Sequence, residues 1–302
     1  MSTSIRAAAL LAIAVCSVAC TIGDAGSAAP SSPASSSEAP HGAASTRPGA
    51  PDARSSSTAP RPADPLRAAL ERAIAGIPGQ ASVAVAGGGR VVIAGNGTGL
   101  PAWSTSKVPL VMAALERAGT PQPAVTADMR AAIIRSDNAA AEAIWSSFPT
   151  PDQAGAAMQQ VLRAGGDERT VVQTTKVRPE YSAFGQTRWE DGPAATFAAR
   201  LPCSPSGRAT AALMREVDAN QQWGAYLLPG ARSVGVKGGW GPGTDGAYVV
   251  RQLAVVQTAG GYTGVMLSAR PADGTFASGR VALTRLADAV RAQLGALPAA
   301  PC

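Results

Sequence analysis

The amino-acid sequence predicts an α/β (α+β) fold in which helices flank one five-stranded antiparallel sheet, with a helical subdomain inserted between the strands. Two β-rich runs precede a mostly helical block at 104–215, and three more β-rich runs follow it. Helical spacing of apolar residues occurs before the first strand and after the last. Strands contributed by both ends of one domain, with helices on either side, pack as layers around a shared core.

The first elements after residue 63 differ in their apolar period. Residues 65–75 carry apolar side chains with the spacing of a helix that packs on one face. Residues 81–87 and 91–94 are short β-rich runs, and the glycine-rich segment between them predicts a hairpin. In the block that follows, apolar periodicity predicts helices at 108–117, 127–144, 153–163, 194–201 and 207–220.

Between the helical block and the late strands, the segment 165–191 shows weak periodicity and predicts an ordered loop. Loops of this length inside a compact domain are usually functional. The last helix is predicted at 280–294. Sheet character returns before it, in strands predicted at 233–236, 248–257 and 262–269.

The N-terminal part predicts an exported chain on a flexible tether. A cation, an apolar run over 7–15 and a small residue at the break are typical of a signal peptide at 1–19, too short to span a bilayer. Cys20 follows directly, which resembles a bacterial lipobox, although Ser17 stands where a leucine is usual. We expect Cys20 to be lipidated and to anchor the protein at the outer membrane face. The alternative is an ordinary signal and a secreted protein. Residues 20–63, rich in Ser, Pro and Ala, predict the tether.

Composition excludes several kinds of function. The net charge of +6 is spread along the chain and aromatic residues are few, which argues against nucleic-acid binding. The only histidine, His41, lies in the tether, and no Cys/His cluster offers a zinc site, so we expect no metal and no cofactor. Cys203 and Cys302 remain for the domain at 64–302. In an oxidising compartment they predict one disulfide; the alternative is two buried free thiols.

Lysine usage points to the chemistry. The chain has only three lysines among its 26 lysines and arginines. One of them, Lys107, stands three residues after Ser104 at the predicted start of a helix, so both side chains face one side. Burial can remove the proton of a lysine, whereas an arginine stays charged. With no histidine in the folded region, a Ser-His-Asp triad is excluded there, and a neutral lysine can activate the serine instead.

Three motifs occur in a characteristic order: Ser104-Thr105-Ser106-Lys107, then Ser136-Asp137-Asn138, then Lys237-Gly238-Gly239. This set resembles the signature of serine β-lactamases of class A and of penicillin-binding proteins. The segment 130–141 is also similar to that superfamily's second motif, and the resemblance covers roughly 64–302. It implies a β-lactamase/transpeptidase-like fold in an exported lipoprotein of actinobacterial type.

The resemblance implies a role for each residue of the motifs. Ser104 would be the acylated nucleophile and Lys107 its base. Ser136 would relay a proton to the leaving nitrogen. Asn138 would hold both the substrate amide and Lys107. At the third motif, Lys237 would steer a substrate carboxylate.

Further substrate contacts are implied at Gly239 and Trp240, where the backbone N–H of Trp240 would join that of Ser104 in binding the oxyanion. The chain departs from the family pattern in three ways. Gly238 replaces the hydroxyl residue of the third motif, and Trp240 is bulky where a small residue is frequent. The first two motifs lie only 32 positions apart, from 104 to 136, so the helical subdomain is trimmed.

A class A β-lactamase also needs a glutamate on the long loop to activate the deacylating water. Glu180 is the better placed candidate and Glu190 the other, but the family's surrounding residues are absent around both. The alternative for each is a solvated or arginine-paired loop residue.

The sequence therefore predicts a serine acyl-transfer hydrolase that acts on β-lactams or on cell-wall D-Ala-D-Ala stem peptides. One alternative is a catalytically weak or inactive lipoprotein of the same fold that binds a cell-wall component or a partner. The other is an esterase on this fold, which needs the Ser-Lys pair but not the glutamate.

Overall fold

A computed structural model describes residues 64–119 and 124–302. The signal peptide, Cys20, His41 and the tether lie outside the described residues. The fold class is confirmed: the strands form one antiparallel sheet in the order β2-β1-β5-β4-β3. The strands are β1 (Gly79–Gly87), β2 (Arg90–Gly95), β3 (Ser233–Pro242), β4 (Tyr248–Thr258) and β5 (Gly261–Pro271).

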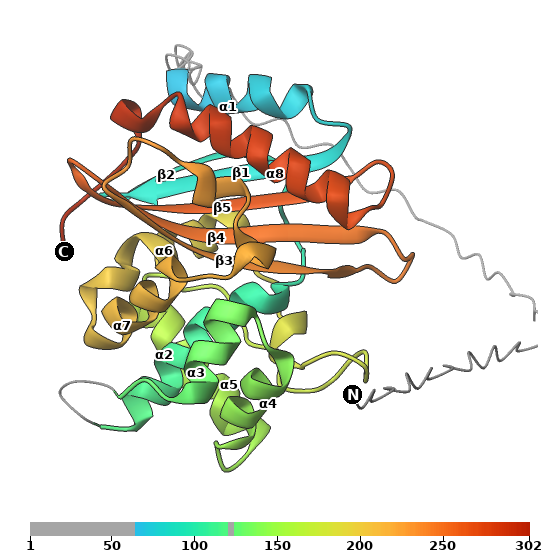
Figure 1. The fold of residues 1–302 in the computed structure, drawn as a ribbon, viewed down its shortest axis with the longest axis vertical. Coiled ribbons are helices and arrows are strands. Elements are labelled where there is room, and N and C mark those ends of the chain that lie inside the picture. Colours follow the sequence, from blue (N-terminus) through green and yellow to red (C-terminus); the bar gives the residue numbers. More distant parts are fainter. Residues whose placement is uncertain (1–63, 120–123) are drawn as a thin grey trace, which may run out of the picture. The chain divides into compact units, whose positions relative to one another are not determined.

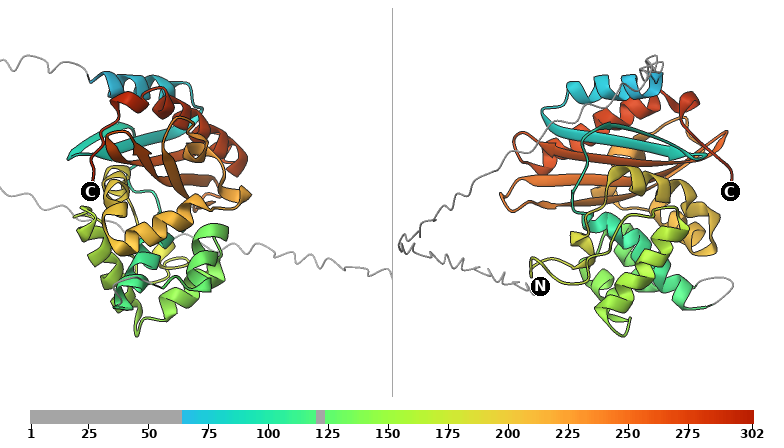
Figure 2. Two further views of the ribbon diagram at one scale, coloured as in Figure 1. Left: turned by 60° about the vertical axis from the view of Figure 1, so that its left-hand side comes forward. Right: turned by 180° about the vertical axis from the view of Figure 1, so that it is seen from behind.

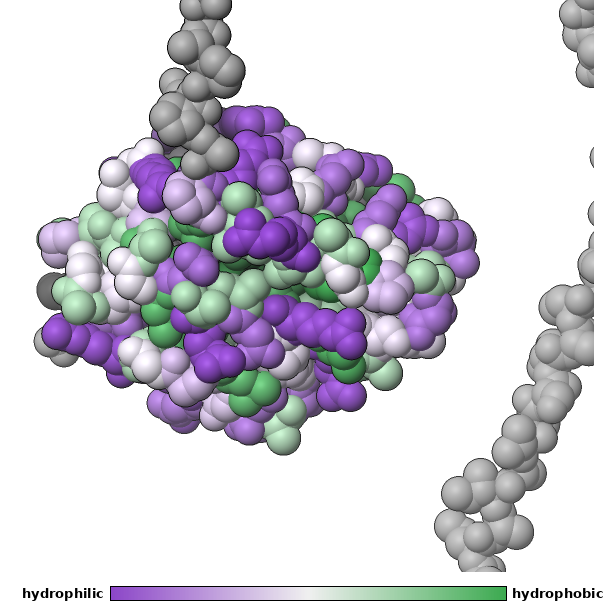
Figure 3. All heavy atoms as spheres, turned by 90° about the horizontal axis from the view of Figure 1, so that it is seen from above, coloured by the Kyte–Doolittle hydropathy of each residue, from purple (hydrophilic) through white to green (hydrophobic). Residues whose placement is uncertain are grey.

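Both faces of this sheet are covered by helices (Figure 1). On β1, Val83 and Val85 point to one hydrophobic core while Ala84 and Ala86 point to another, as the two-residue period of a strand requires. The first core lies under α1 (Pro65–Ala75) and α8 (Phe276–Arg291). The outer side of these helices carries hydrophilic and hydrophobic residues side by side (Figure 3).

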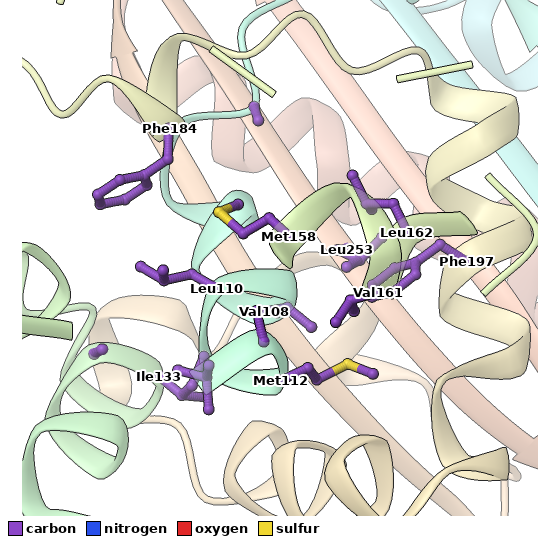
Figure 4. Close-up of a cluster of buried hydrophobic side chains, with 14 of the residues drawn as sticks. Val108, Leu110, Met112, Ile133, Met158, Val161, Leu162, Phe184, Phe197 and Leu253 are labelled. Atoms are coloured by element: carbon purple, nitrogen blue, oxygen red, sulfur yellow. The ribbon is translucent and has the colours of Figure 1, made fainter. Parts of the chain in front are cut away.

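The other face meets the helical part of the chain, which the views in Figure 2 show on that one side of the sheet. Here α6 packs directly on β5, where Gly264 leaves no room for a side chain against the backbone of Ala195. The second core fills the space between α2, α5 and the sheet with aliphatic, methionine and aromatic side chains (Figure 4). The helices are α2 (Lys107–Arg117), α3 (Ala127–Arg130), α4 (Asn138–Ser146), α5 (Pro151–Ala164), α6 (Asp191–Arg200) and α7 (Pro205–Arg215).

Two predicted boundaries are wrong in ways that matter for the site. The helix expected at 127–144 is interrupted, because α3 runs into a π-helical turn over 131–135 and Ser136 then adopts a left-handed φ of 58°. The strand expected to end at 236 continues to Pro242 as β3. Pairing with β4 holds its glycines in the sheet despite their low strand propensity.

The remaining shifts are at element ends. The helix expected at 194–201 begins at Asp191, the one expected at 207–220 ends at Arg215, and the last helix begins at Phe276. Residues 165–190 form the predicted long loop, with one short 3₁₀ turn over Phe184–Gln186. In the part of the chain that the structure describes, no helix has the length and apolar character needed to cross a membrane.

The predicted disulfide joins Cys203, in a short 3₁₀ turn after α6, to Cys302. The C-terminal segment adds a bridge between Tyr262 and Ala300 at the start of β5. The disulfide therefore ties the end of the chain to the helical side of the domain across a sequence separation of 99 residues.

Replacing both cysteines, Cys203→Ser with Cys302→Ser, should lower the free energy of unfolding by about 2–4 kcal/mol, because the cross-link restricts the unfolded chain over a long loop. Urea denaturation of the oxidised wild type and the double variant measures the difference. Dithiothreitol should lower the urea midpoint of the wild type to that of the double variant, and it should leave the midpoint of the variant unchanged. Equal midpoints for both proteins under oxidising conditions would contradict this.

Candidate active site

A cleft of about 310 Å³ lies between the helical part and the edge of the sheet at β3. Five of the predicted site residues line it: Ser104, Lys107, Asn138, Trp240 and, from the long loop, Glu180. Ser136, Lys237 and Gly239 lie outside its lining. Segments far apart in the sequence thus meet at one place. The remaining lining residues are Trp103, Ala139, Glu142, Lys176, Tyr181, Ser182, Phe184 and Gly185.

Ser104 lies in a short 3₁₀ turn, η1 (Trp103–Ser106), that runs directly into α2. Trp103 has a left-handed φ of 49°, a costly conformation for a bulky residue. The turn is held by its own hydroxyls: Thr105 Oγ1 donates to Ala102 O at 2.6 Å, and Ser106 Oγ donates to Trp103 O at 2.6 Å. The serine is therefore presented on a fixed, strained turn, as a nucleophile requires.

β3 is an edge strand, and at Gly239 it approaches the backbone of this turn closely. A side chain there would meet the backbone nitrogen of Ser104 at 3.0 Å and that of Thr105 at 2.9 Å. Only glycine allows this approach. The sequence predicts a substrate contact at Gly239. The structure gives a packing reason for a glycine at this position: without a side chain there, β3 can lie beside the Ser104 backbone.

Lys107 is buried at the start of α2. Its Nζ donates to Ser136 O at 2.7 Å and to Asn138 Oδ1 at 2.6 Å. Burial lowers the pKa of Lys107 to about 7, and the negative charges of Asp137 and Glu142 oppose that shift. A large fraction of this amine is therefore unprotonated near neutral pH, which is the state a general base needs.

The turn at Ser136 brings the second motif to both buried lysines. Its left-handed backbone ends the π-helical turn, and Asp137 then caps α4 by accepting a hydrogen bond from Ala140 N at 2.8 Å. The carbonyl of Ser136 faces Lys107, while its Oγ accepts a hydrogen bond from Lys237 Nζ at 2.8 Å. Ser136 therefore keeps its own hydroxyl proton available for donation.

Lys237 lies on β3 and is completely buried. Its Nζ has three acceptors: Ser136 Oγ at 2.8 Å, Gln221 Oε1 at 2.6 Å and Gly238 O at 2.8 Å. Burial, together with the nearby charge of Lys107, holds its pKa well below the ordinary lysine value. The three acceptors are enough for every N–H donor of this amine, two when it is neutral and three when it is protonated.

Gly238 lies where the family has a hydroxyl. The space that a side chain would enter is taken by two indoles, with Trp223 Cζ2 at 3.0 Å and Trp240 Cζ3 at 3.1 Å from an ideal Cβ. Trp240 also stacks on Phe276 of α8, with ring centroids 5.0 Å apart. The bulky tryptophan is thus fixed by an aromatic cluster and forms one wall of the cleft.

The two glutamate candidates are placed differently. Glu180 lines the Ser104 cleft, with its side chain 52% exposed and an oxygen 3.0 Å from Arg178 Nη2. Glu190 forms an ion pair with Arg169 at 2.7 Å and lines a separate cavity of about 830 Å³. Of the two, only Glu180 shares a cavity with the serine.

A buried ion pair links two chain segments that flank the site. Arg251 of β4 and Asp191 at the start of α6 lie 2.6 Å apart, both almost fully buried. Arg251 Nη1 also donates to Pro101 O at 3.2 Å and to Leu100 O at 3.3 Å, and Nη2 donates to Trp189 O at 2.6 Å. One guanidinium group thus holds the segment before Ser104 and the end of the long loop.

Sequence reasoning missed several residues of this site. Gln221, which binds Lys237, has no motif around it; an amide 16 positions before a strand lysine gives no sequence signal. Glu142 and Lys176 lie 3.8 Å apart in the cleft, from α4 and the long loop. A Glu beside the second motif could have been noticed by helical spacing, since Asn138 and Glu142 are four residues apart.

In the described ranges, no group of three or more His, Cys, Asp or Glu side chains could hold a metal ion. The cleft holds a serine on a strained turn, a lysine with a pKa near 7 and a glutamate. Behind that lysine, the hydroxyl of Ser136 lies between the two buried lysines. Such a set can attack a carbonyl carbon and pass protons to and from it.

No family model matches the chain, and no curated protein matches it. Solved structures do. A β-lactamase from Xanthomonas campestris pv. campestris is 22% identical, with a TM-score of 0.56 over 75% of this chain and 96% of its own. A β-lactamase from Burkholderia vietnamiensis is 17% identical, with a TM-score of 0.59 over 76% of this chain and 96% of its own.

A mutant of the last common ancestor of Gram-negative bacteria class A β-lactamase is 20% identical, with a TM-score of 0.59 over 76% of this chain and 98% of its own. At these identities the likeness shows the fold. The chain has the fold of the class A serine β-lactamases.

The buried amine of Lys107 predicts a stability that rises with pH. The unfolded chain keeps this lysine protonated up to its ordinary pKa of 10.5, whereas the folded chain releases the proton near 7. Between these values the unfolded state binds more protons, so raising the pH favours folding, by at most about 1.4 kcal/mol per pH unit. Relative to Lys107→Met, the wild type should therefore gain stability from pH 7 to pH 9.5 in urea denaturation.

The exposed lysine supplies the control, since Lys176→Met should leave the pH dependence of the wild type unchanged. If the free energy of unfolding depended on pH in the same way in the wild type and in Lys107→Met, the lowered pKa of Lys107 would be contradicted.

Proposed function

We propose that this protein is a serine acyl-transfer hydrolase of the β-lactamase type that forms an acyl-enzyme at Ser104. The observation that carries the proposal is a buried lysine amine with a pKa near 7, one helical turn from a serine in the same cleft. In the proposed first step, neutral Lys107 takes the proton of Ser104, and Oγ attacks the substrate carbonyl carbon to give a tetrahedral intermediate.

In the second step the intermediate collapses. The bond between the carbonyl carbon and the leaving group breaks, Ser136 gives its proton to the leaving atom, and Lys107 passes the proton it took from Ser104 to Ser136 Oγ, which lies 3.5 Å from its Nζ. The hydrogen bond from Lys237 to Ser136 Oγ, at 2.8 Å, supports this direction of transfer. Backbone N–H groups of Ser104 and Trp240 would stabilise the oxyanion. Asn138 would hold Lys107 and the substrate amide.

Deacylation needs a water molecule attacking the same carbon. Glu180 is the proposed base for that water, supported by its place in the cleft. We place the acyl-enzyme's substrates among β-lactams, D-Ala-D-Ala peptides and esters. We also propose that the protein is exported and anchored through Cys20.

An esterase that acts on substrates without a carboxylate is the second candidate, favoured by one observation: the N–H donors of Lys237 already have acceptors in the protein. The carboxylates of β-lactams and stem peptides would find no free N–H donor on Lys237. An ester needs only the Ser-Lys pair and the oxyanion site.

An alkyl fluorophosphonate should add covalently to Ser104 of the full-length protein, since it reacts with activated serines. The intact mass should increase by one phosphonyl group, and peptide mapping should place it on Ser104. Ser104→Ala should remain unmodified, while Ser182→Ala, a second serine of the cleft, should label like the wild type. Labelling that persists in Ser104→Ala would contradict the proposal, and no labelling of any form would favour a binding protein without catalysis.

The rate of labelling should rise with pH and level off above pH 8, with its midpoint near the Lys107 pKa of about 7. The neutral amine is the active form, so protonation below this pH removes the base. Lys107→Arg, which keeps a charge that cannot be released, should slow labelling about 10²–10⁴-fold at every pH. A rate independent of pH between 6 and 8 in the wild type would show that another group activates Ser104.

A further inference from the structure

The cations around the Ser104 cleft are already occupied. The N–H donors of Lys237 already have acceptors within the protein. Lys176 lies 3.8 Å from Glu142. Arg178, which borders the cleft through Glu180, lies 3.0 Å from that carboxylate. Of these three, only Lys176 lines the cleft itself, and there it faces the carboxylate of Glu142.

Lys107 adds no free charge when it acts. As a base it is neutral, and its amine faces Ser136 O and Asn138 Oδ1. The cleft then offers one cation, Lys176, which already lies beside Glu142. It also contains two carboxylates, Glu142 and Glu180.

The β3 side of the cleft is apolar. Gly238 has no hydroxyl to donate, and the space beside it is filled by Trp223 and Trp240. Two further aromatic side chains line the cleft, since Trp103 and Tyr181 pack edge to face with ring centroids 5.0 Å apart. Desolvating a carboxylate against these rings is costly, and the donor they offer it is the buried indole N–H of Trp103, which has no partner within the described residues.

From these contacts we infer that the acyl substrate of Ser104 is a neutral ester or amide without a carboxylate, with an apolar group against Trp240. This rests on the proposed function and narrows it. It reassigns Lys237: the amine positions Ser136 and does not bind a substrate carboxylate. Penicillins and D-Ala-D-Ala peptides, which carry such a group, are then poor substrates.

The experiment compares two alkyl fluorophosphonates that differ only at the end of the alkyl chain, one a methyl ester and the other its free acid. Labelling of Ser104 in the full-length protein is followed by intact mass at pH 7.5. The neutral probe should react about tenfold to a hundredfold faster, the range expected when an anion is buried without a partner. Equal rates, or a faster reaction of the acid, overturn the inference while leaving the proposed function in place.

If neither probe labels Ser104, the proposed function fails and the inference fails with it. A variant tests the electrostatic cause. Glu142→Gln removes one carboxylate from the cleft and frees Lys176, so the preference for the neutral probe should shrink several-fold. Glu71→Gln, an exposed glutamate on α1, is the matched control and should leave the ratio unchanged. A ratio that does not respond to Glu142→Gln overturns the electrostatic argument.

Discussion

The site depends on two lysine amines buried against one turn. Lys107 binds the carbonyl of Ser136 and the side chain of Asn138, and Lys237 binds the hydroxyl of Ser136. Burying an ammonium group is costly, so each amine needs these acceptors, and the turn in return is fixed by them. Burial of the Lys107 amine costs folding free energy, and it also lowers the pKa of Lys107 and makes the amine a base. The same contacts therefore determine both the stability of the site and its reactivity.

The sheet brings the third motif to this turn. β3 is an edge strand, so one side of its backbone is free of strand partners and lies along η1. Gly239 permits that approach, while Lys237, on the same face two residues earlier, reaches Ser136. Arg251 and Asp191 hold the segments on either side, tying the chain before Ser104 to the end of the long loop. The nucleophile is thus fixed from the sheet as well as from α2.

Much of this could be predicted from the sequence, because its signals are local. Strand alternation, the hairpin glycines and the spacing of Ser104 and Lys107 all act within a few residues. Apolar periodicity predicts one helix over 127–144, but the left-handed backbone of Ser136, which faces both buried lysines, interrupts it. The strand predicted at 233–236 continues to Pro242, because pairing with β4 holds its glycines in the sheet. Gln221 reaches Lys237 only through the fold, so no pattern in the sequence points to it.

The chain's three lysines allow a direct test of the central claim, that Lys107 is neutral near physiological pH. Lysine labelled with ¹³C at Cε gives three resonances, and Lys107→Arg identifies the one that belongs to Lys107. Its chemical shift should titrate with a midpoint near pH 7. A Lys107 resonance that keeps the chemical shift of a protonated amine up to pH 9 would contradict the account, since Lys107 could then not act as the base for Ser104.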